Sequence, residues 1–481
     1  MAFLGIDIGS SELRCGLVTP DGHLIGLARV NHDMAVDAEH GRAEQDPDAW
    51  WVGLIRALHE ITERVAVDVA GIAVDGHGPT LTAVDASGRP TRPAITWLDQ
   101  RAALEQAELA TATGLQGWAL GVLPAALWLE RHEPESAART SWYLNTWEAL
   151  TLRLTGVARA SLVHGQAWPA NDTLAAHGLR PWRLAEPIEA GTVVGPLSAT
   201  AASVLGLPSG IPVVAGVVDA FASFHGGGML EPGDAIDVGG SAGGFGVYWD
   251  RAIAAAGSFS TPGPLEGGWV VGGAMAATGK AVEWLRDSVL GGGVPAHVLI
   301  DEAGRVAPGA DGLVFLPYLA GERSPIWDPE ARAAFVGLTL QHGRAHLARA
   351  VLEASALAIR HVAEPILAGG VRVRAMRVAG GPARSNAWNQ IKADVTGFPV
   401  EVPRILETAV TGSAILAATG TGAHPDLRSS IRAMTAIEAR LKPDPARAAI
   451  YDRTYAAYTA IHPAVSPILR ALREHAAEGV G

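Results

Sequence analysis

The sequence predicts an α/β protein built from two copies of one core, because two distant segments share one pattern. Residues 2–8 form an apolar run that leads into Asp-Ile-Gly-Ser-Ser, and a second apolar run follows at 13–18. Residues 235–241 repeat the pattern as Ala-Ile-Asp-Val-Gly-Gly-Ser, and an apolar run follows at 245–248. Each segment is typical of a β-hairpin whose turn is made of Gly and Ser. We therefore expect one such hairpin in each half.

A second pair of segments follows in the same order. Residues 69–78 form an apolar strand that ends in glycine, and residues 376–381 form another. The longer spacing in the second half indicates an insertion in the second copy. Strands that alternate with helical stretches favour sheets with helices packed on their faces.

A turn-rich break separates the halves at 206–212, where Gly and Pro are frequent. It leads into an apolar strand at 213–218, and residues 451–472 have helical periodicity. The expected organisation is two domains and a C-terminal helical segment, with boundaries 1–215, 216–447 and 448–481.

Composition excludes several classes of protein. The net charge of −12 over 481 residues argues against a nucleic-acid binder that needs a basic face. No run approaches eighteen apolar residues, so no membrane span is expected. The single cysteine, Cys15, excludes an intrachain disulfide framework and fits a reducing compartment. The first residues lack a basic segment typical of a signal peptide, so a cytoplasmic location is expected.

The two predicted hairpin turns are candidate phosphate-binding loops. Glycines allow close backbone approach, and consecutive N–H groups in a tight turn form an anion-binding concavity. Ser10, Ser11 and Ser241 could add hydroxyl donors, and Asp7 could hold Mg²⁺ through water. Two such loops could clamp a triphosphate between domains. Two ordinary polar turns are the alternative, and it stays open.

Two further segments carry candidate chemistry. Asp219 directly follows the apolar strand at the junction of the halves, where a carboxylate could accept a proton from a substrate hydroxyl. It could equally start the next helix. Residues 380–386, Gly-Gly-Pro-Ala-Arg-Ser-Asn, could let a nucleoside lie against the backbone, while Ser385 could also cap a helix.

Longer motifs resemble one known family. Residues 97–101, Trp-Leu-Asp-Gln-Arg, are similar to the Trp-x-Asp-x-Arg segment of the FGGY carbohydrate kinases, which include xylulokinase, glycerol kinase and gluconate kinase. Residues 313–324 and 333–353 resemble the stretch around the second signature of that family, and 272–287 also matches. The resemblance extends from Asp7 to the C-terminal helix.

This resemblance implies a fold and an activity. The fold would be two actin-like, ribonuclease-H-like domains around an interdomain cleft, with the sugar side and first phosphate loop in residues 1–215 and the nucleotide side in 216–447. The activity would be ATP-dependent phosphorylation of a hydroxyl of a small sugar or polyol, with Mg²⁺ as a cofactor. The expected acceptor is a pentulose such as xylulose. A homodimer stays open.

The resemblance also implies roles for single residues. Asp219 would be the catalytic base and Asp7 the metal ligand. The residues implied in nucleotide binding are Gly9, Ser10, Ser11, Arg14, Gly240, Ser241, Gly279, Gly381, Ser385 and Asn386. The residues implied in acceptor binding are His77, Gly78, Pro79, Trp97, Asp99 and Arg101.

Three departures from the family pattern concern the acceptor side. Ala125 stands where Lys is usual, and Ala220 follows the proposed base where Asn is frequent. Pro79 lies in a segment that replaces Gly-Gln-Met-His, and proline cannot replace that histidine as a hydrogen-bond partner. A plain D-xylulose acceptor is therefore not assigned. Two alternatives stay open, an actin-fold ATPase without a sugar acceptor and a catalytically silent relative that acts as a sensor.

Overall fold

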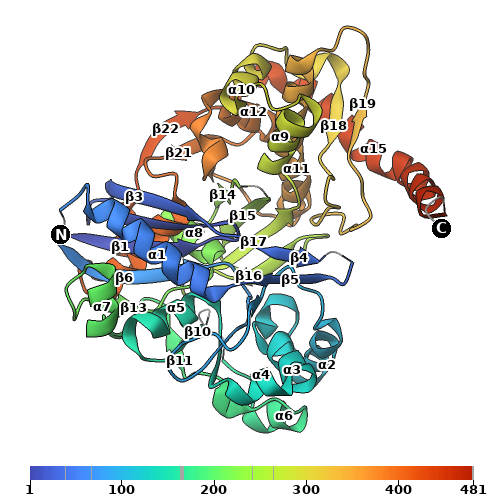
Figure 1. Cartoon of the computed structure of the whole chain (residues 1–481). Coiled ribbons are helices and arrows are strands. Elements are labelled where there is room, and N and C mark those ends of the chain that lie inside the picture. Colours follow the sequence, from blue (N-terminus) through green and yellow to red (C-terminus); the bar gives the residue numbers. More distant parts are fainter. Residues whose placement is uncertain (38, 67, 163–166, 241, 264, 479–481) are drawn as a thin grey trace. The chain divides into compact units, whose positions relative to one another are not determined.

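The computed structural model describes residues 1–478 apart from 38, 67, 163–166, 241 and 264 (Figure 1). The chain forms two compact units, and each is composed of two stretches of sequence. Unit 1 comprises Met1–Gly228 and Glu407–Ala436, and unit 2 comprises Met229–Leu406 and Ile437–Gly481.

A six-stranded sheet forms the centre of unit 1. Its strand order is β12-β13-β6-β1-β2-β3. The strands are β1 (Ala2–Ile8), β2 (Glu12–Val18), β3 (Leu24–Asn31), β6 (Val69–Gly76), β12 (Val193–Pro196) and β13 (Pro212–Val214). β1, β2 and β3 are antiparallel neighbours, whereas β6 runs parallel to β1 and β13 parallel to β6. The predicted first hairpin is confirmed.

Helices cover this sheet. α1 (Pro47–Thr62) begins with Asp46 as its N-cap and packs on β2 and β3. α13 (Thr408–Gly420) returns from later in the chain and packs on β1 and β6, with α8 (Asp219–Gly226) against it. The approach to β1 is close, since a Cβ atom on Gly5 would lie 2.0 Å from the carbonyl oxygen of Val410.

The other elements of unit 1 surround that sheet. The small sheets comprise β4 (Ala35–Asp37), β5 (Arg42–Gln45) and β8 (Ala94–Ile95), β7 (Thr82–Val84) with β9 (Trp142–Leu144), and β10 (Ala160–Leu162) with β11 (Pro187–Glu189). The helices are α2 (Ala103–Thr113), α3 (Leu123–His132), α4 (Pro134–Arg139), α5 (Thr146–Thr155), α6 (Asn171–Ala176), α7 (Ala199–Leu205) and α14 (Leu427–Met434), with 3₁₀ turns η1 (Gly117–Leu120) and η2 (Pro181–Arg183).

A seven-stranded sheet forms the centre of unit 2, in the order β16-β17-β15-β14-β20-β21-β22. The strands are β14 (Asp234–Asp237), β15 (Gly243–Trp249), β16 (Phe259–Pro262), β17 (Trp269–Met275), β20 (Ala375–Val378), β21 (Val400–Pro403) and β22 (Ile437–Leu441). β14, β15 and β17 are antiparallel neighbours, while β20 runs parallel to β14 and β21 parallel to β20. The second predicted hairpin is also confirmed.

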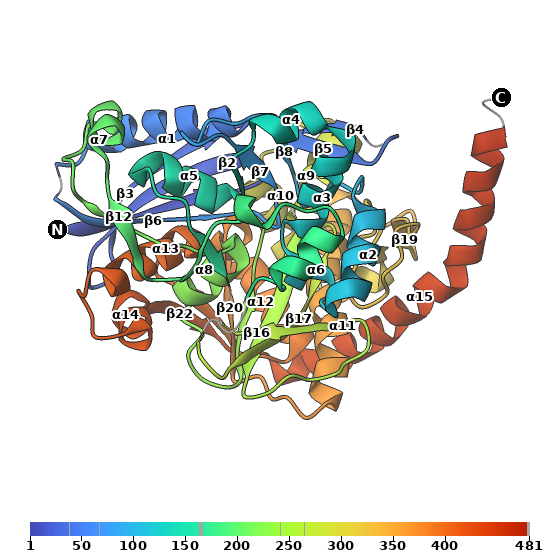
Figure 2. The same ribbon diagram turned by 90° about the horizontal axis from the view of Figure 1, so that it is seen from below.

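Unit 2 contains the longest helices. The two longest are α11 (Arg344–Ala368) and α15 (Pro445–Glu478). The other helical elements of unit 2 are α9 (Gly279–Trp284), the π-turn η3 (Leu285–Val289), α10 (Ala296–Gly304), η4 (Ala310–Gly312), η5 (Gly381–Arg384) and α12 (Asn386–Thr396). A hairpin of β18 (Val314–Leu316) and β19 (Ala334–Val336) completes the unit. The expected C-terminal helix is present, and its last turns extend away from the rest of unit 2 (Figure 2). No helix of the described chain is long and apolar enough to cross a membrane.

The two central sheets share one topology. The order β3-β2-β1-β6-β13 in unit 1 has the same directions as β17-β15-β14-β20-β21 in unit 2. This confirms the duplicated, ribonuclease-H-like core. The compact units differ from the expected segments 1–215, 216–447 and 448–481, because α8 and residues 407–436 belong to unit 1 and the C-terminal helix to unit 2. Close backbone contact between α8 and α13 explains this, since a Cβ atom on Gly412 would lie 1.9 Å from the carbonyl oxygen of Ala222.

Candidate active site

Three carboxylates lie at neighbouring strand ends of unit 1. Asp7 is near the end of β1, and Asp75 stands directly opposite it on the parallel strand β6. Val218 forms a parallel bridge with Gly76, so that Asp219 follows the next position along the sheet and opens α8. Ligands of open α/β sheets bind at the carboxyl ends of strands, which is where this cluster lies.

Asp7 has a single basic partner. It is buried, and Arg14, its register partner on the antiparallel strand β2, places Nη1 3.0 Å from Asp7 Oδ2. The same guanidinium lies 2.6 Å from Glu12 Oε1, so its positive charge is divided between two carboxylates. Burial raises the pKa of Asp7, while Arg14 opposes this effect.

Asp75 is fully buried and is held from one side. Ser413 Oγ, on α13, donates a hydrogen bond of 2.6 Å to Asp75 Oδ2. The other oxygen, Oδ1, is buried and receives no hydrogen bond from a donor group of the described residues, although the Asp7 carboxyl lies close enough to share a proton with Asp75. Burial, and after it the negative charge of Asp7, raise the pKa of Asp75 well above its ordinary value. This carboxyl therefore lies in a strongly perturbed environment.

Asp219 has the properties of a proton acceptor. The residue is partly exposed although its carboxyl lies in the interior, and Oδ1 accepts a hydrogen bond of 2.7 Å from the backbone N–H of Ala220. Burial of the carboxyl and the nearby charge of Asp7 raise the pKa of Asp219 to about 7. A base whose pKa lies near the working pH combines availability with driving force for proton transfer.

The carboxylates fit a magnesium ion that keeps much of its water. No group of three His, Cys, Asp or Glu side chains in the described part of the chain is arranged to hold a metal ion directly. Mg²⁺ is usually held through one or two carboxylates together with water and phosphate oxygens. Asp7 and the unpartnered Oδ1 of Asp75 provide a donor set of that kind.

The first predicted phosphate loop is a tight turn after β1. The Gly9 N–H donates a hydrogen bond of 3.0 Å to the carbonyl oxygen of Glu12, which closes the hairpin. A Cβ atom on Gly9 would lie 2.9 Å from that oxygen. Ser10 Oγ accepts a hydrogen bond of 3.1 Å from Trp97 Nε1, and Ser11 is exposed. The structure thus brings Ser10, expected at the nucleotide, next to Trp97, expected at the acceptor.

The segment expected to contact the acceptor is mostly buried. His77 is 1% exposed, its Nδ1 lies 2.9 Å from Thr80 Oγ1, and burial lowers its pKa to about 3. The imidazole is therefore neutral at pH 7. A Cβ on Gly78 would lie 2.9 Å from the ring of Trp147, and of residues 77–79 only Pro79 is partly exposed.

Asp99 and Arg101 bond mainly to each other. Asp99 accepts three hydrogen bonds from Arg101, at 2.6, 2.8 and 2.9 Å, and one of 2.7 Å from Ala43 N–H. A carboxylate has about four acceptor positions, so this set fills them. Arg101 also pairs with Glu44 at 2.7 Å. The pair fixes the segment that follows Trp97 and presents no unused carboxylate oxygen.

Two of the predicted nucleotide residues of unit 2 are joined at one glycine turn. The Gly279 N–H donates a hydrogen bond of 3.0 Å to the carbonyl oxygen of Gly240. Gly381 opens η5 and borders open space, whereas Ser385 caps α12 by accepting a hydrogen bond of 3.2 Å from Trp388 N–H. Exposed Asn386 is the first residue of that helix. Ser241 lies outside the described residues.

Asp237 occupies the place in unit 2 that Asp7 has in unit 1, but its surroundings differ. Its register neighbours are Phe245 on β15 and Val378 on β20. Lys392 Nζ, on α12, lies 2.5 Å from Asp237 Oδ2, and both side chains are buried. The Lys392 ammonium also lies 5.3 Å from the centroid of the Trp388 ring. Asp237 therefore ends a strand within a buried ion pair.

Three of these residues were not predicted from the sequence: Asp75, Ser413 and Lys392. Asp75 carried a signal, since it is the one charged residue in an apolar strand, directly before a glycine. Ser413 and Lys392 carried none, because each reaches its partner from a helix that is distant in the sequence.

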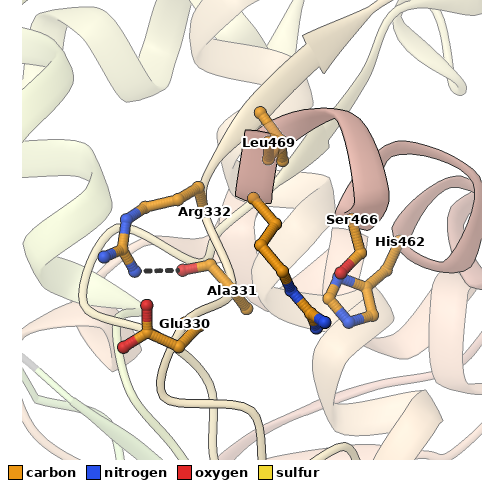
Figure 3. A pocket seen from close by; sticks show the side chains of 7 residues that line it. Glu330, Ala331, Arg332, His462, Ser466 and Leu469 are labelled. Carbon is orange, nitrogen blue, oxygen red and sulfur yellow. Dashed lines mark hydrogen bonds between the residues drawn. The ribbon is translucent and has the colours of Figure 1, made fainter. Parts of the chain in front are cut away.

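The pockets found in unit 2 are separate from these residues. Figure 3 shows one between α15 and residues 330–332, lined by His462, Ser466 and Leu469 among others. Its volume of about 10 Å³ is close to the space needed for one water molecule. A larger one of about 230 Å³ lies between α11, α12 and α15, beside Arg360 and Asp394. Neither is lined by a predicted site residue.

Comparison with known proteins agrees with this geometry. The N-terminal domain of the FGGY family of carbohydrate kinases matches residues 2–226, and the C-terminal domain of that family matches 241–421. A xylulose kinase of Escherichia coli is 32% identical over 422 residues, covering 82% of this chain and 85% of its own. A gluconokinase of Bacillus subtilis is 26% identical over 453 residues and covers 87% of each chain. The crystal structure of a xylulose kinase from Rhodospirillum rubrum has a TM-score of 0.80 at 29% identity, covering 98% of this chain and 100% of its own. Together with the duplicated ribonuclease-H-like core, these matches show that the chain belongs to the FGGY family of carbohydrate kinases.

Proposed function

We propose that the protein transfers the γ-phosphoryl group of ATP to a hydroxyl of a small sugar or polyol, with Asp219 as the general base. The observation that carries this proposal is the position of Asp219, which opens α8 directly after the bridge between Val218 and Gly76 and so lies at the strand ends of unit 1. Burial and the nearby charge of Asp7 raise the pKa of its carboxyl to about 7, which suits a base. Membership of a carbohydrate kinase family supports the same reaction.

In this reaction Asp219 accepts the proton of the acceptor hydroxyl while that oxygen bonds to the γ-phosphorus. The bond between the γ-phosphorus and the bridging oxygen breaks, and ADP leaves with the electron pair. The turn after β1 supplies the backbone N–H groups of Ser10 and Ser11 for phosphate oxygens, while the Gly9 N–H closes the hairpin. In unit 2, Gly240, Gly279, Gly381 and Asn386 contact the nucleotide. Mg²⁺, held by Asp7, would neutralise charge on the phosphates.

A pentulose is the proposed acceptor class, because relatives named xylulose kinase align over most of the chain. The proposed contacts of the acceptor are Ser10, Trp97 and Pro79. Ser10 and Trp97 are joined by a hydrogen bond, and Pro79 is partly exposed. We assign Asp99 to positioning Arg101 and the adjoining strand, since its acceptor positions are filled. A cytoplasmic location belongs to this proposal and is supported by Cys15, a buried free thiol.

The test is a coupled ADP-release assay with MgATP over a panel of pentuloses, hexuloses, aldonates, erythritol and glycerol. We expect ADP release that depends strictly on one class of acceptor, with a pentulose fastest. Asp219→Ala, which lacks the proposed base, is the inactive control. ADP release at the same rate without any acceptor would favour an ATPase, and no release with the whole panel would favour a silent relative.

A further inference from the structure

Asp75 has no part in the proton transfer described above, although it lies beside Asp7. It is the one charged residue in β6, and its side chain is completely buried. The parallel register of β1 and β6 sets its Cα opposite that of Asp7. Two carboxyl groups are therefore brought together in the interior by the sheet itself.

The bonds around this pair leave one oxygen unused. Ser413 Oγ fixes Asp75 Oδ2 at 2.6 Å, whereas no donor group of the described chain bonds to the buried Oδ1. The Asp7 carboxyl is close enough to share a proton with Asp75, which brings both carboxyls to one place. Arg14 is shared by Asp7 and Glu12, and no ion pair of the described residues includes Asp75. A buried carboxylate oxygen without a partner costs stability unless a ligand satisfies it.

We propose that Asp75 is a positioning residue for the divalent cation at Asp7, its Oδ2 fixed by Ser413 and its Oδ1 accepting a hydrogen bond from a water of the cation. A water-mediated contact suits Mg²⁺, which is usually held by one or two carboxylates and keeps several of its waters. Groups that hydrogen-bond to the ligands of a metal orient them and raise affinity. The inference rests on the proposed function, which supplies the need for Mg²⁺.

Binding of Mn²⁺ to the full chain, without nucleotide or acceptor, tests this inference. Free Mn²⁺ is measured by its paramagnetic resonance signal for the wild type, Asp75→Asn and Ser413→Ala. Removal of a partner of this kind typically weakens metal binding by about 10–100-fold, so we expect at least a tenfold higher Kd for Asp75→Asn. Ser413→Ala retains every carboxylate and should raise the Kd less, by about two- to tenfold.

Asp85→Asn is the matched control, because it removes a carboxylate from a turn in the same unit and should leave the Kd unchanged. Thermal unfolding of each variant separates loss of binding from loss of folding. If Asp75→Asn does not fold, the comparison of Ser413→Ala with the wild type decides the question. A Kd for Asp75→Asn within twofold of the wild type, or no detectable Mn²⁺ binding to the wild type, would overturn the inference.

The result is distinguishable from failure of the proposed function. If Mn²⁺ binding depends on Asp75 but no sugar in the panel is phosphorylated, the cation site stands and the proposed function fails. If a sugar is phosphorylated while Mn²⁺ binding does not depend on Asp75, only the role of Asp75 fails.

Discussion

The ends of β1 and β14 occupy equivalent places in two sheets of the same topology, yet different side chains surround them. In unit 1, Asp7 has Arg14 and Asp75 as its register neighbours, so that a charged cluster forms. In unit 2, Phe245 and Val378 take those places, and Lys392 neutralises Asp237. The comparison teaches that a strand-end aspartate becomes a candidate catalytic group through its neighbours, not through its place in the fold.

The largest effect is expected at the unit 1 cluster. Asp219→Ala removes the proposed base, and general-base assistance is typically worth about 10²–10⁴-fold. We expect kcat to fall by that factor while ATP binding, measured by calorimetry, stays within a fewfold of the wild type. Turnover within a fewfold of the wild type would show that Asp219 is not the base.

Breaking the ion pair of unit 2 is expected to change a comparable free energy, but as a loss of folding stability and not of activity. Asp237→Asn leaves the Lys392 ammonium buried without an anion, and breaking such a pair typically costs about 3–5 kcal/mol. Denaturant unfolding should show this loss. The double variant Asp237→Asn with Lys392→Met should recover most of the loss, because it removes the unpaired charge. A single variant as stable as the wild type would contradict the structural role.

The pH dependence of turnover sharpens the contrast. The pKa of Asp219 is raised to about 7, and a base acts in its ionised form. We therefore expect kcat/KM to rise with pH through about 7 and to fall about tenfold for each pH unit well below it. The measurement is a pH–rate profile at saturating Mg²⁺. A profile that is flat between pH 5 and 8 would contradict this assignment.

The smallest effect is expected at the cap of α12, which separates a structural from a nucleotide-binding role. Ser385→Ala removes the bond to Trp388 N–H and should cost about 1 kcal/mol of unfolding free energy. Ser385→Asp retains a good cap and adds negative charge. We expect this variant to remain stable but to raise the KM for ATP. An unchanged KM would restrict Ser385 to capping.

Much of the fold could be predicted from the sequence, because both hairpins follow from local patterns. The Asp-x-Gly segments at the ends of β1 and β14 and the glycine-ended strand β6 mark the duplicated core. That residues 407–436 belong to unit 1 could not be predicted, since this depends on close packing of α13 against β1.

The site was predictable only in part, for a related reason. Asp7 and Asp219 stand at strand and helix boundaries that are visible in the sequence. The partners that distinguish the two strand ends, Ser413 and Lys392, come from helices far along the chain. Which aspartate is neutralised is decided by such distant contacts, and sequence spacing does not record them.

One measurement tests the contrast between the two strand ends most directly. Asp7→Asn and Asp237→Asn are compared in the same acceptor-dependent ADP-release assay, as a function of Mg²⁺ concentration and per folded molecule. We predict that Asp7→Asn is folded but loses turnover, or needs far more Mg²⁺, whereas Asp237→Asn turns over within a fewfold of the wild type. Normal Mg²⁺ dependence in Asp7→Asn, together with lost turnover in folded Asp237→Asn, would contradict the account.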